Sequence, residues 1–375
     1  MWQRPAGVGK CRGDAVLTMA TPAVARPDCA AIRFPRTRYL GSKRRIADFI
    51  VEEVSRLDFD CVLDAFGGTG AVAHAFKRAG KAVTYNDGLE FNHQIGLALI
   101  ENDGVALSAE EIESIGRRHD GVVYPDFIER TFDGIYFTRA ENRWLDAAVT
   151  NIRGLSCRYK RALAWFAVFQ SAMAKRPYNL FHRKNLYMRT ADVERSFGNK
   201  RSWDRSFAEH FASFSDEAAS GLIDSGGRCR AVCADALDLE PGYDMVYIDT
   251  PYISRAGVGV CYRDFYHFLE GLVAYDTWET MIDYKSKHRR LSAGGVDPWT
   301  CAARCREQFH GLFALFRESN LVVSYRDDGI PGIDELVAML SCFKRVVEVV
   351  DGRRRQYALS TRRKTREVLI IATDG

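Results

Sequence analysis

Residues 62–80 read VLDAFGGTGAVAHAFKRAG, which joins an apolar run, a glycine-rich turn and a stretch with helical periodicity. Gly68 and Gly70 permit backbone conformations that side chains disfavour, and they let the main chain approach a ligand closely. The helix expected after the turn begins with unpaired amide groups, which favour a nucleotide-like ligand. The stretch therefore predicts the first strand, turn and helix of an α/β fold, with a ligand site at the turn.

Short β-branched runs alternate with helical patterns along most of the chain, which is typical of a parallel sheet covered by helices on both faces. Seven such runs predict one doubly wound, mostly parallel, seven-stranded Rossmann-like sheet. We expect its strands at residues 61–65, 82–86, 229–234, 244–248, 321–325, 345–350 and 368–373.

The chain between the second and third expected strands is too long for one crossover helix, so it predicts an insertion. We expect an inserted, mainly helical lobe at residues 121–225, with the catalytic domain formed by residues 32–120 and 226–375. Residues 1–31 are rich in Ala, Pro, Gly and Arg, and we expect them to form a disordered extension in which Met19 could be the true start.

The inserted region is strongly basic. Residues 151–210 hold thirteen Lys and Arg against four Asp and Glu, a balance of +9 in a chain whose net charge is +4. Within this region, KRPYNLFHRKNLYMR at 175–189 interleaves basic and aromatic side chains, which suits a surface that attracts phosphates and stacks against bases. The alternative is a solvated basic face over a small core of Phe181, Leu186 and Tyr187.

A second motif, DMVYIDTPY at 244–252, is a buried strand that ends in Asp, Thr, Pro and Tyr. Ligands of open α/β sheets bind at the carboxyl ends of strands, so Asp249 and Tyr252 should lie beside the glycine turn. An aromatic amine attacks a methyl group only when acceptors hold its hydrogens, and Asp249 with the Thr250 carbonyl would supply two acceptors. Tyr252 would offer a flat face to a flipped base. The alternative is an ordinary capping Asp and turn Pro at a strand end.

Together these motifs resemble the Dam-like (alpha-group) adenine-N6-specific DNA methyltransferases. The resemblance rests on RYLGSKRRI at 38–46, FGGTG at 66–70, DTPY at 249–252, SYRDDG at 324–329 and YALSTRRKTREVLII at 357–371. It implies transfer of a methyl group from S-adenosyl-L-methionine to the N6 amine of adenine in double-stranded DNA. It also implies sequence-specific action in a restriction-modification or epigenetic system, in which any cognate restriction endonuclease would act separately.

The resemblance also implies roles for single residues. Tyr39 and Lys43 would line the methionine end of the cofactor, Asp87 would bind its ribose and Asp235 its adenine amine. The family usually has Pro where this chain has Thr250, and Thr should serve because the role there belongs to a backbone carbonyl. The expected cofactor-binding residues are Tyr39, Lys43, Asp64, Phe66, Gly68, Gly70, Asp87 and Asp235. The expected catalytic loop is Asp249, Thr250, Pro251 and Tyr252, and the expected DNA contacts are Lys175, Arg176, Arg183 and Lys184.

Other function classes share parts of this pattern. A methyltransferase for an RNA base, for cytosine N4 or for a protein glutamine needs the same acceptors, and a catalytically inactive DNA-binding module could keep the same fold. A dinucleotide oxidoreductase would have G-x-G-x-x-G where this chain has GGTGAVA.

The remaining features point to an ordinary intracellular enzyme. Ten scattered cysteines predict free thiols and no metal site, although the pairs Cys229/Cys233 and Cys301/Cys305 have ligand-like spacing. Because the chain has no long apolar run, we expect no membrane partner and a cytoplasmic location.

Overall fold

The computed structural model describes residues 32–191, 200–292, 294–355 and 365–375, so the extension expected at residues 1–31 lies outside the described residues. Seven strands form one sheet in the order β3-β2-β1-β4-β5-β7-β6. They are β1 (Cys61–Asp64), β2 (Ala82–Asn86), β3 (Arg230–Val232), β4 (Met245–Ile248), β5 (Asn320–Arg326), β6 (Val346–Arg355) and β7 (Thr365–Thr373).

Strands β3, β2, β1, β4 and β5 run parallel, and β7 runs antiparallel between β5 and β6. The prediction of a mostly parallel seven-stranded sheet is confirmed. The largest difference in bounds is at β6, which has ten residues where six were expected, and β3 has three residues where six were expected. Strand β3 lies at the edge of the sheet and has only β2 as a neighbour, so its ends are not held in a ladder.

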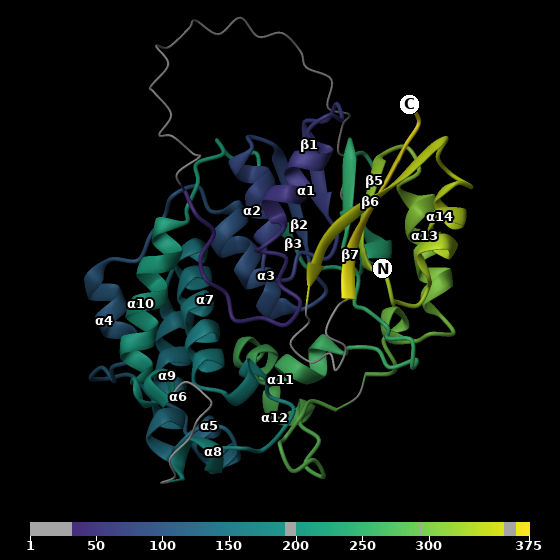
Figure 1. Cartoon of the computed structure of the whole chain (residues 1–375). Helices are drawn as coiled ribbons and strands as arrows, with labels where there is room; N and C mark the ends of the chain where they lie inside the picture. Colours follow the sequence, from purple (N-terminus) through teal and green to yellow (C-terminus); the bar gives the residue numbers. More distant parts are fainter. Residues whose placement is uncertain (1–31, 192–199, 293, 356–364) are drawn as a thin grey trace, which may run out of the picture.

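Helices cover both faces of the sheet (Figure 1). On one side lie α1 (Ala47–Val54), α2 (Ala71–Arg78) and α3 (Glu90–Gly96), and on the other lie α13 (Cys305–Leu315) and α14 (Ile333–Leu340). Successive side chains of a strand point to opposite faces of the sheet, so both faces are apolar. In β1, Val62 packs into the core on the side of α1, α2 and α3, and Leu63 packs into the core on the side of α13 and α14. No helix in the described part of the chain has the length and apolar character that a membrane span requires.

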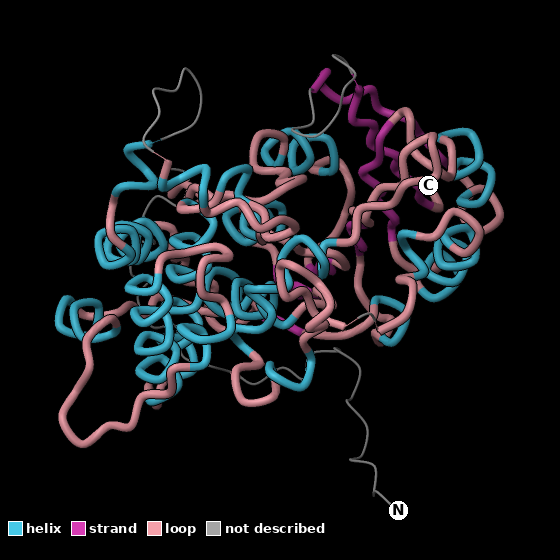
Figure 2. Tube along the Cα trace, turned by 90° about the horizontal axis from the view of Figure 1, so that it is seen from below, coloured by secondary structure: helices cyan, strands magenta, loops and turns pink. Residues whose placement is uncertain are grey.

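The chain between β2 and β3 is mainly helical, as expected, and gathers on one side of the sheet (Figures 1 and 2). Its long central helix, α7, is buried continuously from residue 162 to residue 174 and packs against both α10 and α3. The elements of this lobe are η2 (Leu97–Glu101), α4 (Ala109–Ile115), α5 (Phe127–Thr131), α6 (Arg139–Gly154), α7 (Arg158–Ala174), η3 (Pro177–Asn179), α8 (Tyr187–Thr190), α9 (Lys200–Asp204) and α10 (Phe207–Ser220).

A second segment of the chain packs onto the same lobe. It follows β4 and contains α11 (Tyr262–Val273) and α12 (Trp278–Met281), while the short helices η4 (Ala236–Asp238) and η5 (Pro298–Thr300) flank it in sequence. The Phe268 ring stacks on Phe181 at a centroid distance of 5.1 Å, and Trp278 lies 4.8 Å from Phe132. The lobe therefore takes in residues from both sides of β4 in sequence, and the domain bounds 121–225 stay a prediction.

Lys175, expected as a DNA contact, lies in the interior of this lobe with 2% of its surface exposed. Its ammonium donates to the Trp203 carbonyl at 2.7 Å and pairs with Glu141 at 2.9 Å. Those contacts join the end of α7 to α6 and α9, so the structure gives Lys175 a packing role in place of the expected phosphate contact.

Arg176 differs from the expectation in the same way, since it is 1% exposed. Its guanidinium donates to the carbonyls of Leu180 and Arg183 and lies 4.4 Å from the centroid of the Tyr136 ring. Burial lowers the pKa of Arg176 to about 9. The basic run is therefore amphipathic. Lys175 and Arg176 donate to carbonyls inside the lobe, whereas Arg183 and Lys184, the other two expected DNA contacts, are exposed.

Candidate active site

The glycine turn after β1 forms one wall of the site. Nearby side chains leave no room there for a residue larger than glycine. A Cβ on Gly67 would lie 2.0 Å from the Tyr85 ring, and Gly68 and Gly70 have φ angles of 51° and 76°. The Gly68 amide donates to Asp87 Oδ2 at 2.9 Å, which ties the turn to the end of β2. The ends of β1 and β2 are thereby held as one surface.

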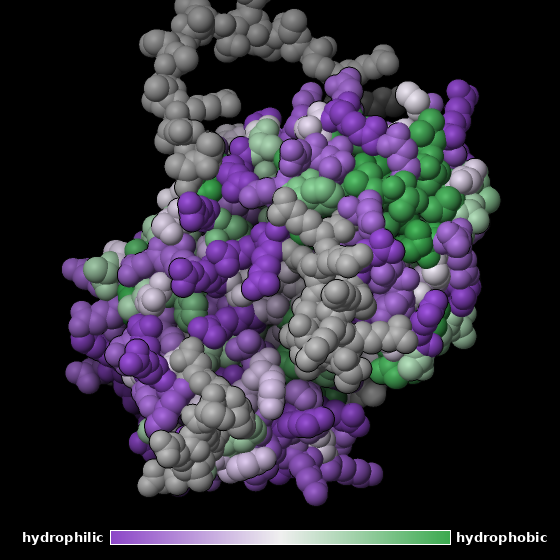
Figure 3. Space-filling model, viewed as in Figure 1, coloured by the Kyte–Doolittle hydropathy of each residue, from purple (hydrophilic) through white to green (hydrophobic). Residues whose placement is uncertain are grey.

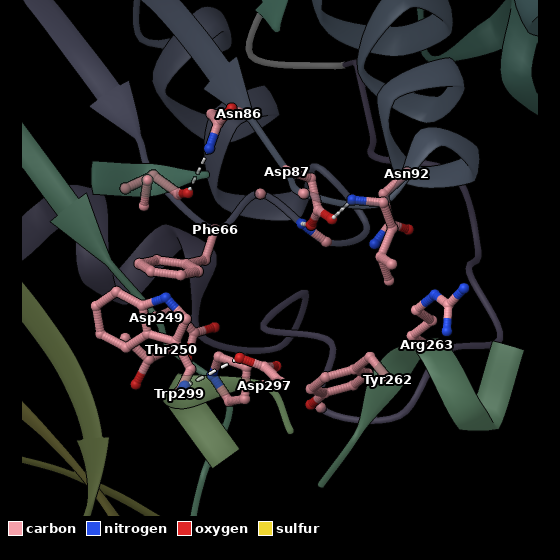
Figure 4. Close-up of a pocket in the computed structure, with 18 of the residues that line it drawn as sticks. Phe66, Asn86, Asp87, Asn92, Asp249, Thr250, Tyr262, Arg263, Asp297 and Trp299 are labelled. Atoms are coloured by element: carbon pink, nitrogen blue, oxygen red, sulfur yellow. Dashed lines mark hydrogen bonds between the residues drawn. The ribbon is translucent and has the colours of Figure 1, made fainter. Parts of the chain in front are cut away.

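A cavity of about 550 Å³ opens at the carboxyl ends of β1, β2 and β4 (Figure 4). Its size falls in the range of cofactor and small-molecule sites. With the exception of Gly70, which supports the turn from behind, every residue expected to bind cofactor or to catalyse lines this cavity. The sequence therefore identified the site, although the role of each residue there remains a prediction.

Asp64 Oδ1, Asn92 Oδ1 and Thr250 Oγ1 are among the buried polar atoms of cavity-lining residues that have no hydrogen-bond partner in the described part of the chain. Buried polar atoms in folded proteins nearly always have a partner, so their convergence on one cavity indicates a polar ligand. Burial raises the pKa of Asp64 well above its ordinary value, and the charges of Asp249 and Asp87 raise it further. A cationic ligand would relieve that cost.

Asp87 and Asp235 present carboxylates at two other places on the cavity wall. Asp87 Oδ1 accepts from the Leu89 amide at 2.9 Å, and Asp235 Oδ1 accepts from the Leu237 amide at 3.0 Å. These bonds fix both side chains, and each carboxylate keeps lone pairs for donors such as hydroxyl or amino groups.

Flat aromatic rings form two opposite sides of the cavity, as Figure 4 shows for Phe66 and Trp299 on one side and Tyr262 on the other. The Phe66 and Trp299 rings meet edge to face at 4.9 Å, and Tyr39 stacks on Tyr262 at 5.5 Å and on Tyr266 at 4.6 Å. Such walls suit planar ligands, including purine rings.

At the end of β4, the buried ammonium of Lys43 lies between the buried carboxylate of Glu367 and the carboxylate of Asp249, which is 16% exposed. Lys43 Nζ lies 2.7 Å from Asp249 Oδ1 and 2.9 Å from Glu367 Oε1. Burial alone would lower the pKa of Lys43, but the two carboxylates outweigh it and the pKa is raised. Lys43 is therefore a fixed cation held by Asp249 and Glu367 at the wall of the cavity, and its expected place at the methionine end of a cofactor stays a prediction.

The Tyr252 hydroxyl completes this cluster, which we call the Lys43 cluster (Lys43, Asp249, Tyr252 and Glu367). It donates to Asp249 Oδ1 at 2.7 Å or to Glu367 Oε1 at 2.9 Å, and it also contacts Lys43. Both contacts to Asp249 within the described structure fall on Oδ1, so Oδ2 is the oxygen left to accept from a ligand. Burial raises the pKa of Asp249, Lys43 lowers it, and the charge of Glu367 raises it.

Glu367 was not among the expected site residues. It is 3% exposed, comes from β7, and accepts from the Ser324 hydroxyl at 2.7 Å. The signal in the sequence is an acidic residue at the start of the otherwise apolar run EVLII, where it becomes buried once the strand is placed inside the sheet. Further cavity residues that sequence reasoning missed are Asn92, Tyr262, Arg263, Asp297 and Trp299.

Comparison with known proteins points to one family. A family model described as D12 class N6 adenine-specific DNA methyltransferase matches residues 39–277. The chain is 26% identical over 328 residues to the type II methyltransferase M2.HphI of Haemophilus parahaemolyticus, a match that covers 85% of this chain and 91% of the relative. It is also 24% identical to the modification methylase LlaI of Lactococcus lactis subsp. lactis and 23% identical to the modification methylase StsI of Streptococcus sanguinis.

Those last two matches cover 89% and 88% of this chain, which spans about half the length of each of the two relatives. The family match extends over more than half of the chain and includes the glycine turn and the DTPY loop. The chain belongs to the D12 class of N6 adenine-specific DNA methyltransferases, and the prediction from the sequence is confirmed at this level.

Replacing Glu367 by Gln tests whether Glu367 sets the charge of Asp249. The variant keeps an oxygen that accepts from Tyr252, but it removes the negative charge that raises the pKa of Asp249. Asp249 accepts an amine hydrogen best when ionised, so the acid limb of single-turnover methylation should move to lower pH in Glu367→Gln. Glu348→Gln, which neutralises an exposed carboxylate on β6, is the matched control and should leave the profile in place. An equal loss of rate at every pH would show that Glu367 acts only through packing.

Proposed function

We propose that this protein methylates adenine in double-stranded DNA with S-adenosyl-L-methionine as methyl donor, sequence-specifically, as the modification enzyme of a restriction-modification or epigenetic system. The observation that carries this proposal is Asp249 Oδ2, the oxygen of a largely buried carboxylate that accepts no bond from the described residues and lines the same cavity as the glycine turn. The names of three relatives, one a type II methyltransferase and two modification methylases, support the biological setting.

The charge of the cavity supports this cofactor. Asp64, Asp87 and Asp249 all have raised pKa values, chiefly through burial, which favours a positively charged ligand. S-adenosyl-L-methionine carries a sulfonium and an ammonium, and when bound it supplies an electrophilic methyl group. Asp64 would accept from the ammonium, Asp87 from the ribose hydroxyls and Asp235 from the adenine amine.

The Lys43 cluster would prepare the target amine. Lys43 and Tyr252 fix Asp249 through Oδ1, so Oδ2 can accept one N6 hydrogen while the Thr250 carbonyl accepts the other. Both bonds draw the nitrogen lone pair out of the ring, which makes N6 a better nucleophile. Because Lys43 stays charged, it favours the ionised, acceptor-only form of Asp249.

Tyr252 would hold the flipped base. Its ring is fixed by an edge-to-face contact with Tyr325 at 5.3 Å, and its hydroxyl is fixed by the cluster. The family usually has Pro where this chain has Thr250, but the backbone carbonyl that would accept an N6 hydrogen is the same in both. The Thr250 side chain is buried among residues of the cavity. On the lobe, the exposed Arg183 and Lys184 would contact DNA phosphates.

Asp64→Asn should weaken binding of S-adenosyl-L-methionine by about 1.5 to 3 kcal/mol, the worth of a hydrogen bond to a charged group, or roughly ten- to hundredfold. Because the pKa of Asp64 is raised, affinity in the native protein should grow as pH rises through that pKa, with a proton released on binding. Titration calorimetry in buffers of different ionisation enthalpy measures both quantities.

The matched control is Asp60→Asn, because Asp60 precedes β1 at its other end and its side chain is fully exposed. It should bind the cofactor as the native protein does. If Asp64→Asn binds with native affinity and an unchanged pH dependence, Asp64 does not contact the cofactor.

Asp249→Ala should leave cofactor binding nearly intact and lower the single-turnover rate of DNA methylation by at least a hundredfold, or about 2.7 kcal/mol, as is typical of losing one transition-state hydrogen bond. Tyr252→Phe is the companion variant, because it keeps the ring and removes only the hydroxyl that fixes Oδ1. A folded, cofactor-bound Asp249→Ala protein that methylates at the native rate would rule out the assignment.

A further inference from the structure

The segment after α12 forms a compact, strongly basic loop that the expected DNA contacts do not include. Residues 283–290 read DYKSKHRR, and the loop is closed by an antiparallel bridge between Ile282 and Leu291. Asp283, its only acidic residue, pairs with Arg290 at 3.3 Å. Lys285, Lys287 and Arg289 have no ion pair within 4.0 Å among the described residues, so the loop keeps an uncompensated positive charge.

One buried tyrosine holds this loop against the basic run of the lobe. The Tyr136 hydroxyl lies 2.7 Å from the His288 carbonyl and 2.6 Å from the Phe181 carbonyl. Since Arg183 and Lys184 follow Phe181 almost directly, cations about a hundred positions apart in sequence lie on one surface. We call it the two-loop surface, residues 178–187 and 283–290. It occupies the lower end of the molecule in Figure 1, where Figure 3 shows mostly hydrophilic side chains.

The two-loop surface also carries exposed aromatic rings. Tyr178, Tyr187 and Tyr284 are 65%, 69% and 50% exposed. Among the described residues, the other large apolar side chains with this much exposure are all valines. Exposed tyrosines beside lysine and arginine suit a partner with flat bases or sugars along a phosphate chain.

Backbone conformation singles out the same two loops. Within the described ranges, the non-glycine residues with positive φ are Tyr178, Asn179 and Arg289, at 63°, 58° and 55°. Such conformations persist only where surrounding contacts enforce them, and they concentrate at functional sites. For Arg289 those contacts are a bond from its guanidinium to the Tyr284 carbonyl at 2.7 Å and a cation–π contact with the Tyr284 ring at 4.9 Å.

The loop is joined to the mouth of the cavity. Arg263, which lines the cavity from α11, donates to the carbonyl of Ser292 at 3.0 Å, just beyond the bridge that closes the loop. A duplex that places a flipped base at Asp249 would therefore run past residues 283–290.

We propose that residues 283–290 form a second DNA-contacting segment, in which Lys285, Lys287 and Arg289 bind phosphates of the duplex next to the target base while Arg183 and Lys184 bind from the lobe. This inference rests on the proposed function. It adds a path for the DNA to that function. The duplex would run between two loops, one before β4 in sequence and one after it.

The test compares Lys285→Gln/Lys287→Gln with Arg317→Gln/Arg345→Gln. The control pair removes the same charge from exposed arginines that precede β5 and β6 at the edge of the sheet opposite the cavity. The affinity of each protein for a duplex that contains its target sequence is measured against salt concentration. The loop variant should lose about 0.9 units of log–log slope for each phosphate contact removed, and the control should keep the native slope. Both should bind S-adenosyl-L-methionine as the native protein does.

Arg289→Gly is the second variant, because glycine accepts the positive φ without strain and only the side chain is lost. It should fold and still bind duplex with a reduced slope. Native slopes in both loop variants, or equal losses in loop and control variants, would overturn the proposal while leaving the proposed function in place. A native protein that binds no duplex would instead overturn the proposed function. Native slopes together with lost binding of an acidic polypeptide such as polyglutamate would assign the loop to an acidic protein partner and also overturn the proposal.

Discussion

The structure depends on one constraint: a single buried ammonium, Lys43, must satisfy two carboxylates, the buried Glu367 and the largely buried Asp249. Removing water from each of these ions costs several kcal/mol, and leaving one without its partner typically costs about 3 to 5 kcal/mol. The three residues come from the segment before α1, the end of β4 and the start of β7. Satisfying them therefore fixes the relative positions of both ends of the catalytic domain.

The antiparallel direction of β7 follows from that requirement. Parallel strands present their carboxyl ends at the cavity, whereas an antiparallel strand presents its first residues there, and Glu367 is near the start of β7. The sheet order β4-β5-β7 then places Glu367 two strands from Asp249, with β5 between them. With Lys43 and the Tyr252 hydroxyl both on Oδ1 of Asp249, the fold leaves Oδ2 toward the cavity, which is the geometry that an amine donor needs.

Local sequence patterns were sufficient for the parts of the molecule that obey local rules. The glycine turn, the buried strand ending in DTPY and the alternation of strands with helices follow from backbone freedom and periodicity, and they identified the fold and the strand ends at which the cavity opens. Glu367 was missed because its burial depends on β7 entering the sheet between β5 and β6, which no local pattern specifies. Lys175 and Arg176 were taken for surface cations because charge in sequence does not show which carbonyls a folded lobe leaves in need of donors. The loop at 283–290 was overlooked because only the packing of α11 and α12 brings it to the lobe.

The central claim is that Asp249, held by Lys43 and Glu367, directs a methyl group to N6 of adenine. Its most direct test is to express the native protein and Asp249→Asn in a host that lacks DNA methylation, and to map modified bases in the genomic DNA by long-read sequencing. The account predicts N6-methyladenine at one short recurring sequence with the native protein and none with Asp249→Asn. Methylation of a different base, no modified base with the native protein, or the same pattern with both proteins would contradict it.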